Sequence, residues 1–132
     1  MKNGDVVPIN EEHKQVEVAR ELEALAKTLA HSTRDIPTPS DSYALLAELA
    51  TTIESIEQGC RQIAAWHERV VDGTHYFGED ERGDGGTGTV TAADELRRAA
   101  AALDVASTAV RAAQSANGVV RWVDTVQSGK TP

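Results

Sequence analysis

Apolar side chains recur along this chain at the three- and four-residue spacing of amphipathic helices. The first such stripe consists of Val18, Leu22, Leu25 and Leu29. Asn10 followed by two glutamates is a favourable helix start. The segment RDIPTP ends the pattern, because proline has no backbone N–H to donate and disfavours helical backbone before it. We predict a first helix over residues 11–32.

A second stripe is longer and more regular. Thr38 is suited to cap it, with Pro39 at the first helical position. Its members are Leu46, Leu49, Ile53, Ile56, Cys60, Ile63, His67 and Val70. An unbroken alternation of three and four is typical of a coiled-coil seam. Asp72–Gly73 interrupts the pattern, so a second helix is predicted over residues 39–72.

A third stripe follows a glycine-rich segment. Thr91 and Asp94 have the spacing of a capping box. The apolar positions and one asparagine are Leu96, Ala99, Leu103, Ala106, Val110, Ala113, Asn117 and Val120. We expect a helix over residues 92–126 that bends at Gly118; an extended tail formed by the β-branched run VVRWV is the alternative.

These elements predict an all-α fold, an antiparallel up-down-up three-helix bundle with long, coiled-coil-like second and third helices. The predicted domain spans residues 11–127, between an N-terminal arm (1–10) and a disordered tail (128–132). A flexible, acidic, Gly-rich loop over residues 73–90 joins the second and third helices. Tyr43 and Trp122 then fall at one end of the bundle, and Trp66 falls at the other.

The first predicted helix is too short to cover the second beyond about Cys60. An apolar stripe left without cover usually marks an interface, so we predict a homodimer. The alternative is that residues 1–9, which include Val6, Val7 and Ile9, fold back over the stripe. An asparagine at a seam position can also fix register and partner number. The candidate interface residues are Ile63, Trp66, His67, Val70, Val71 and Asn117.

Charge and composition restrict the partners. With 21 acidic and 13 basic side chains the formal charge is −8, which disfavours binding to phosphate backbones, so no nucleic-acid partner is expected. No stretch approaches the roughly 18 apolar residues of a membrane span, and the N-terminus lacks the apolar run of a signal peptide. Cys60 is the single cysteine, which fits a reducing compartment. We therefore expect a cytoplasmic protein without a membrane partner.

The stretch GDGGTGTVTAADEL, from Gly83 to Leu96, has some of the spacing of a calcium-binding EF-hand loop. Aligning Gly88 with the EF-hand glycine places Gly83, Gly85 and Thr87 at ligand positions, and two of these have no side-chain oxygen. No calcium site, other metal or cofactor is expected. A linker is the simplest interpretation, and a loop that binds a partner protein is the alternative. Its candidate residues are Tyr76, Phe77, Glu79, Asp80, Glu81 and Asp84.

Two short motifs resemble those of known families. YFGED, Tyr76 to Asp80, resembles the YxxxD signal that follows the helical hairpin of type VII secretion substrates, although the W-x-G turn of the small members is missing. This resemblance implies a secreted hairpin protein. ESIE, Glu54 to Glu57, resembles the metal-binding glutamates of all-helical nucleotide pyrophosphohydrolases, without that family's complete EExxE and ExxD pattern. This resemblance implies a metal-dependent enzyme that uses Glu54, Glu57, His67 and Glu68.

Neither motif extends over much of the chain. The regular stripes extend over most of it, and they favour contacts between helices over chemistry at a single site. The predicted function is therefore a small acidic helical module for protein–protein interaction or assembly. It acts as a homo-oligomer and has no catalytic activity of its own.

Overall fold

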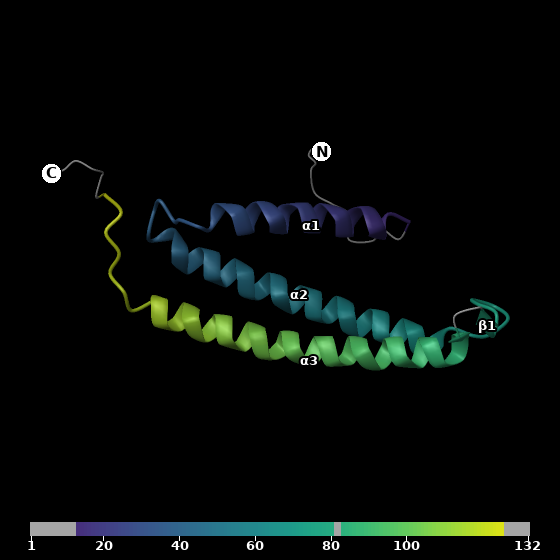
Figure 1. Ribbon diagram of the computed structural model, residues 1–132. Coiled ribbons are helices and arrows are strands. Elements are labelled where there is room, and N and C mark those ends of the chain that lie inside the picture. Colours follow the sequence, from purple (N-terminus) through teal and green to yellow (C-terminus); the bar gives the residue numbers. More distant parts are fainter. Residues whose placement is uncertain (1–12, 81–82, 126–132) are drawn as a thin grey trace. The chain divides into compact units, whose positions relative to one another are not determined.

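The computed structural model describes residues 13–80 and 83–125. In these residues the chain forms helices α1 (Gln15–Ser32), α2 (Asp41–Arg69) and α3 (Gly85–Asn117) and the short strands β1 (Glu79–Asp80) and β2 (Gly83–Asp84) (Figure 1). The chain divides into two compact units, Met1–Pro37 and Thr38–Pro132. The predicted all-α class is confirmed, as is the packing of the second predicted helix against the third.

Helix α1 is amphipathic and ends where the sequence predicts. At its C-terminus both the N–H and the hydroxyl of Thr33 donate to the carbonyl of Leu29. The predicted start at Asn10 lies outside the described residues, and the regular helix begins at Gln15. By their spacing Val18, Leu22 and Leu29 share one face, yet no residue of α1 is buried.

Helix α2 is shorter than the predicted span of 39–72. The turn at Thr38–Pro39 starts it, because Asp41 N–H donates to Thr38 O (2.9 Å) and Ser42 N–H to Pro39 O (3.1 Å). The regular helix runs from Asp41 to Arg69. It ends there because Val70 has extended backbone, with a ψ of 145°.

The connection after α2 is an ordered turn followed by a small hairpin. Gly73 has a φ of +86°, which favours glycine, and its N–H donates to Tyr76 O. Strands β1 and β2 pair antiparallel, Glu79 with Asp84 and Asp80 with Gly83. The predicted loop over 73–90 is therefore shorter in the structure, since α3 already begins at Gly85.

Both ends of α3 differ from the predicted 92–126. Asp84 caps the helix early, since its carboxylate accepts from Gly86 N–H (3.0 Å) and from the Thr87 hydroxyl (2.9 Å). The helix ends at Asn117, and residues 120–125 are neither helix nor strand. The helix therefore does not continue through residues 118–125 as predicted; Val119 lies in a turn, and residue 126 is outside the described residues.

Helices α2 and α3 lie side by side as an antiparallel hairpin (Figure 1). Among the described residues, the buried side chains are all small: Ala50, Ala64, Ala93, Ala100 and Ser107. They recur at intervals of seven or fourteen residues along their helices, so they form one line on each. Small side chains at a helix interface let the two backbones approach closely. The hairpin core is therefore a narrow seam, flanked by half-buried Leu, Ile and Val.

The seam uses only half of each predicted stripe. On α2, Leu46, Ile53, Cys60 and His67 are half-buried beside Ala50 and Ala64; on α3, Leu96, Leu103, Val110 and Asn117 accompany Ala93, Ala100 and Ser107. Of the other predicted positions, Ile56, Ile63, Ala99, Ala113 and Val120 are exposed, whereas Leu49, Val70 and Ala106 are half-buried. The reason is geometric. The apolar side chains extend over a wider arc of each helix than a single neighbouring helix can cover.

Candidate functional site: the open apolar face of the hairpin

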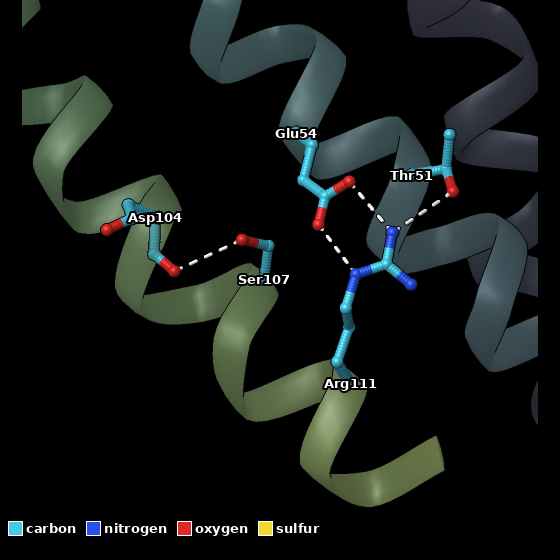
Figure 2. Close-up of polar contacts among 5 residues, drawn as sticks. All are labelled: Thr51, Glu54, Asp104, Ser107 and Arg111. Atoms are coloured by element: carbon cyan, nitrogen blue, oxygen red, sulfur yellow. Dashed lines mark hydrogen bonds and ion pairs between the residues drawn. The ribbon is translucent and has the colours of Figure 1, made fainter. Parts of the chain in front are cut away.

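Two ion pairs between α2 and α3 mark one flank of the seam. The Arg111 guanidinium donates to both carboxylate oxygens of Glu54, at 2.7 and 2.8 Å, and also to the hydroxyl of Thr51 (Figure 2). Arg97 grips Glu68 in the same way, at 2.6 and 2.9 Å. Two-point pairing of arginine with a carboxylate is directional, so the two pairs define the antiparallel register.

The hydrogen bonds between Glu54 and Arg111 also change the pKa of both side chains. Hydrogen bonds from Arg111 hold the pKa of Glu54 below its usual value, and the same bonds raise the pKa of Arg111. Both side chains remain more than two-fifths exposed. Water and salt screen such a pair, so we infer that its main effect is on register and that its contribution to stability is small.

The opposite flank of the seam is apolar. Helical spacing places Leu49, Ile56 and Ile63 of α2, and Val70 directly after it, on the side of the seam away from Glu54 and Glu68. The same spacing places Ala92, Ala99, Ala106 and Ala113 of α3 on the side away from Arg97 and Arg111. We call these eight residues the open apolar face. Its α2 half has large side chains and its α3 half has small ones.

Five of the six predicted interface residues gather at the C-terminal end of α2. Ile63, Trp66 and Val71 are 50%, 47% and 53% exposed, while His67 and Val70 are half-buried. His67 Nδ1 lies 2.9 Å from the carbonyl of Ile63, and its ring meets the Trp66 indole edge-on. These contacts hold the two rings in place beside the exposed aliphatic side chains.

The sixth predicted interface residue lies elsewhere. Asn117 is at the other end of the hairpin, where its amide donates to the Ser42 hydroxyl (2.8 Å) and accepts from the Trp122 indole (3.2 Å). Both ends of its amide are therefore engaged within the chain. The structure does not bring Asn117 together with Ile63 and its neighbours.

The predicted partner-loop residues have different surroundings. The Tyr76 ring packs against the start of α3, so close that a Cβ on Gly85 would lie 2.9 Å from it. Phe77 is 84% exposed, and Asp84 is occupied as the cap of α3. Glu79 and Asp80 form β1, whereas Glu81 lies outside the described residues.

The glutamates considered for an enzyme site pair with arginines. Besides the pairs of Glu54 and Glu68, Glu57 binds Arg61 one turn away at 2.9 Å. In the part of the chain that the structure describes, no group of three or more His, Cys, Asp or Glu side chains is placed to hold a metal ion.

The sequence did not predict a polar cluster at the start of α2. The Asp124 carboxylate accepts from the Ser40 N–H (2.8 Å) and the Ser40 hydroxyl (2.5 Å), and these bonds lower the pKa of Asp124. An open pocket of about 320 Å³ lies beside it, lined by Ser40, Tyr43, Asn117, Gly118, Val120 and Trp122. The shared position of Tyr43 and Trp122 follows from antiparallel pairing, but the Asp124 contact joins residues 84 positions apart and has no local signal.

No helix within residues 13–80 and 83–125 combines the length and apolar character needed to cross a membrane. Comparison of the chain with protein-family models, with curated proteins and with solved structures finds no match.

Proposed function

We propose that this chain is a helical assembly module that associates with itself through the open apolar face and has no catalytic activity of its own. The observation that supports this proposal is the division of each apolar stripe. Half of the stripe on α2 packs against α3, and the other half, from Leu49 to Val70, lies on the open face. A helix needs such a wide stripe only when it contacts two neighbours, which implies a further helix over this face.

Helix α1 is the first candidate for that position. Its stripe of Val18, Leu22, Leu25 and Leu29 suits one groove, and only a short connection separates Ser32 from Asp41. A connection of that length favours antiparallel neighbours. Packing of α1 along the open face would complete an up-down-up three-helix bundle with coiled-coil-like seams. In this arrangement α1 and its hairpin are parts of one folded domain.

Helix α1 is too short to cover the whole face. Its 18 residues span about 27 Å, whereas the 29 residues of α2 span about 44 Å. Running back from the start of α2, α1 reaches about Cys60. Ile63, Trp66, Val70 and Val71 lie beyond it, and a second copy of the chain would cover them.

A two-fold axis through this region would place the same patch of both copies in contact. Isologous pairing of this kind is the commonest form of self-association. The four residues of the patch are uncharged, and the Glu68–Arg97 ion pair lies on the opposite flank of the seam. The overall charge of −8 on each copy opposes association, so we expect the dimer to strengthen as salt screens this repulsion.

Hydrogen exchange at two protein concentrations tests this proposal. We expect residues 60–71 to gain protection as the concentration rises, because these residues would form the contact between copies. Residues 15–32 should show the same protection at both concentrations, because α1 would pack within its own chain. Protection of residues 60–71 that does not change with concentration would contradict the proposed contact.

The two alternative functions have less support from the geometry. The hairpin that the structure defines is α2–α3, and Tyr76 lies in its bend, whereas the secretion signal follows a hairpin. The glutamates of the enzyme alternative are engaged by arginines. Loss of export on Tyr76→Ala, or metal found by elemental analysis of the purified chain, would revive the respective alternative.

A further inference from the structure

An open pocket lies between the start of α2 and the end of α3, and we propose that it binds the quaternary ammonium group of a small solute. The pocket has a volume of about 320 Å³ and is lined by Ser40, Tyr43, Asn117, Gly118, Val120 and Trp122. This volume is at the lower end of the range of about 300–1,000 Å³ that is typical of small-molecule sites. The inference goes beyond the proposed self-association and is independent of it, because Asn117 lies at the opposite end of the hairpin from Ile63.

Two aromatic side chains line this pocket, and the end of α3 holds both of them in place. The Tyr43 ring lies against Gly118, so close that a Cβ on Gly118 would lie 3.1 Å from Tyr43 Cε1. The Trp122 indole donates to the Asn117 side chain at 3.2 Å. Tyr43 and Trp122 nevertheless remain 46% and 42% exposed, so part of each side chain is accessible to a ligand.

A carboxylate lies one hydrogen bond away from the pocket lining. Asp124 accepts from both the N–H and the hydroxyl of Ser40, which lines the pocket. These bonds lower the pKa of Asp124, so the carboxylate is ionised at neutral pH. It also lies at the N-terminus of α2, a position that would otherwise attract an anionic ligand.

The charge and the rings around the pocket favour a cation. None of the six lining residues is basic, and Arg121, in the same segment as Trp122, does not line the pocket. An ionised carboxylate attracts a cation, and the whole chain has a net charge of −8. The π faces of tyrosine and tryptophan attract a cation as well, tryptophan more strongly.

The hydrogen bonds of the lining favour a cation without N–H groups. The Asn117 amide donates to the Ser42 hydroxyl and accepts from the Trp122 indole, and the Ser40 hydroxyl is bonded to Asp124. These side chains are therefore already engaged within the chain. A primary ammonium group has three N–H donors to satisfy, whereas a quaternary ammonium group has none and depends on rings and charge alone.

Titration of the full-length chain with choline tests the proposal, in parallel with the neutral compound in which a tert-butyl group replaces the trimethylammonium group. Proton–nitrogen NMR spectra at constant ionic strength follow the Trp122 indole and the amides of Gly118 and Val120. We expect choline to bind about five- to thirtyfold more tightly than the neutral compound, the effect of two half-exposed rings. Equal affinities, or no shift at these signals with choline, would overturn the proposal.

Removal of either ring tests its role. Trp122→Leu and Tyr43→Leu keep an apolar side chain, and Tyr43 lies within α2, so its replacement leaves the segment after α3 intact. We expect each variant to bind choline about two- to fivefold more weakly and the neutral compound no more weakly than wild type. The matched control is Trp66→Leu, the same change at the other end of the hairpin, which should bind choline like wild type. Equal weakening by Trp66→Leu would overturn the assignment to this pocket.

Asp124→Asn tests the carboxylate, because the amide keeps the size of the side chain and an acceptor for Ser40. We expect this variant to bind choline more weakly and the neutral compound unchanged. An unchanged affinity for choline would overturn the contribution of the charge. Circular dichroism verifies that the helical content of each variant equals that of the wild type.

Vesicles of phosphatidylcholine distinguish a free solute from a lipid headgroup that carries the same quaternary ammonium group. We expect the chain not to co-sediment with these vesicles, because the phosphate of the headgroup would lie close to the Asp124 carboxylate and be repelled by it. Co-sedimentation that is lost in both Trp122→Leu and Tyr43→Leu would overturn the assignment to a free solute.

Discussion

Ile63→Asp is the substitution that separates assembly from folding most clearly. Ile63 lies on the open apolar face, and half of it is exposed within one chain. The substitution places a carboxylate where we expect a second copy to pack. It leaves the buried line of Ala50, Ala64, Ala93 and Ala100 intact. We therefore expect a folded protein that no longer dimerises well.

The size of the effect follows from the exposed half of the side chain. Full burial of an isoleucine contributes about 1.5–3 kcal/mol, so burying the exposed half of Ile63 contributes about 1 kcal/mol per copy. A two-fold interface contains the residue twice, and the loss of about 2 kcal/mol weakens the dissociation constant about 30-fold. Desolvation of the new carboxylate adds to this loss, so 30-fold is a lower bound.

Sedimentation velocity over a dilution series measures the dissociation constant, and thermal unfolding followed by circular dichroism monitors the fold. Gln62→Asp is the matched control, because it adds the same charge one residue away on the side of α2 opposite the seam. We expect Gln62→Asp to dimerise like wild type, apart from the small effect of added charge. If Ile63→Asp is folded and its dissociation constant equals that of Gln62→Asp, the open face around Ile63 is not the interface.

Three further predictions concern the hairpin itself. Ala100→Leu should lower the free energy of unfolding by about 1–3 kcal/mol in urea titrations, because Ala100 is fully buried in a seam of small side chains. Gly85→Ala should lower the melting temperature, since its Cβ would lie 2.7 Å from Gly78 O, whereas Gly88→Ala has open space and should gain about 0.5–1 kcal/mol in helix stability. The free energy of unfolding should fall slightly as the pH is lowered through the depressed pKa of Glu54, because the unfolded chain binds that proton more readily than the folded one. In Arg111→Met, the urea midpoint of unfolding should therefore depend less on pH.

Each of these predictions has an outcome that contradicts it. Wild-type stability of Ala100→Leu would mean that the helices are not closely packed at that point. Equal melting temperatures for the two glycine variants would mean that the turn does not press on the start of α3. If the urea midpoint of Arg111→Met depends on pH as that of the wild type does, Arg111 does not lower the pKa of Glu54 in solution.

The elements that the sequence predicted well carry strong local signals. The end of α1 follows from the prolines after Arg34, and the start of α2 from Thr38–Pro39. The pairing of α2 with α3 follows from stripes of matching spacing. The sequence could not divide those stripes between two neighbours, because helical periodicity identifies a face without identifying what covers each part of it.

The errors at the two ends of α3 have separate causes. Asp84, three residues before Thr87, is a usable N-cap signal, but Gly85, Gly86 and Gly88 have low helix propensity and hid the first turn. At the other end, Gly118 and the valines after it are compatible both with a bent helix and with an extended tail, and the local sequence does not favour either one clearly. In the structure Trp122 bonds Asn117 at the end of α3, and Asp124 bonds Ser40 directly before α2. A contact between residues 84 positions apart leaves no periodic signal in the sequence.

The central claim is that the uncovered end of the open apolar face joins two copies of this chain. Light scattering coupled to size exclusion, at several protein concentrations and at low and high salt, tests it most directly. The account predicts a mass approaching twice the 14.1 kDa of one chain as concentration and salt increase. A mass of one chain under every condition would contradict the account.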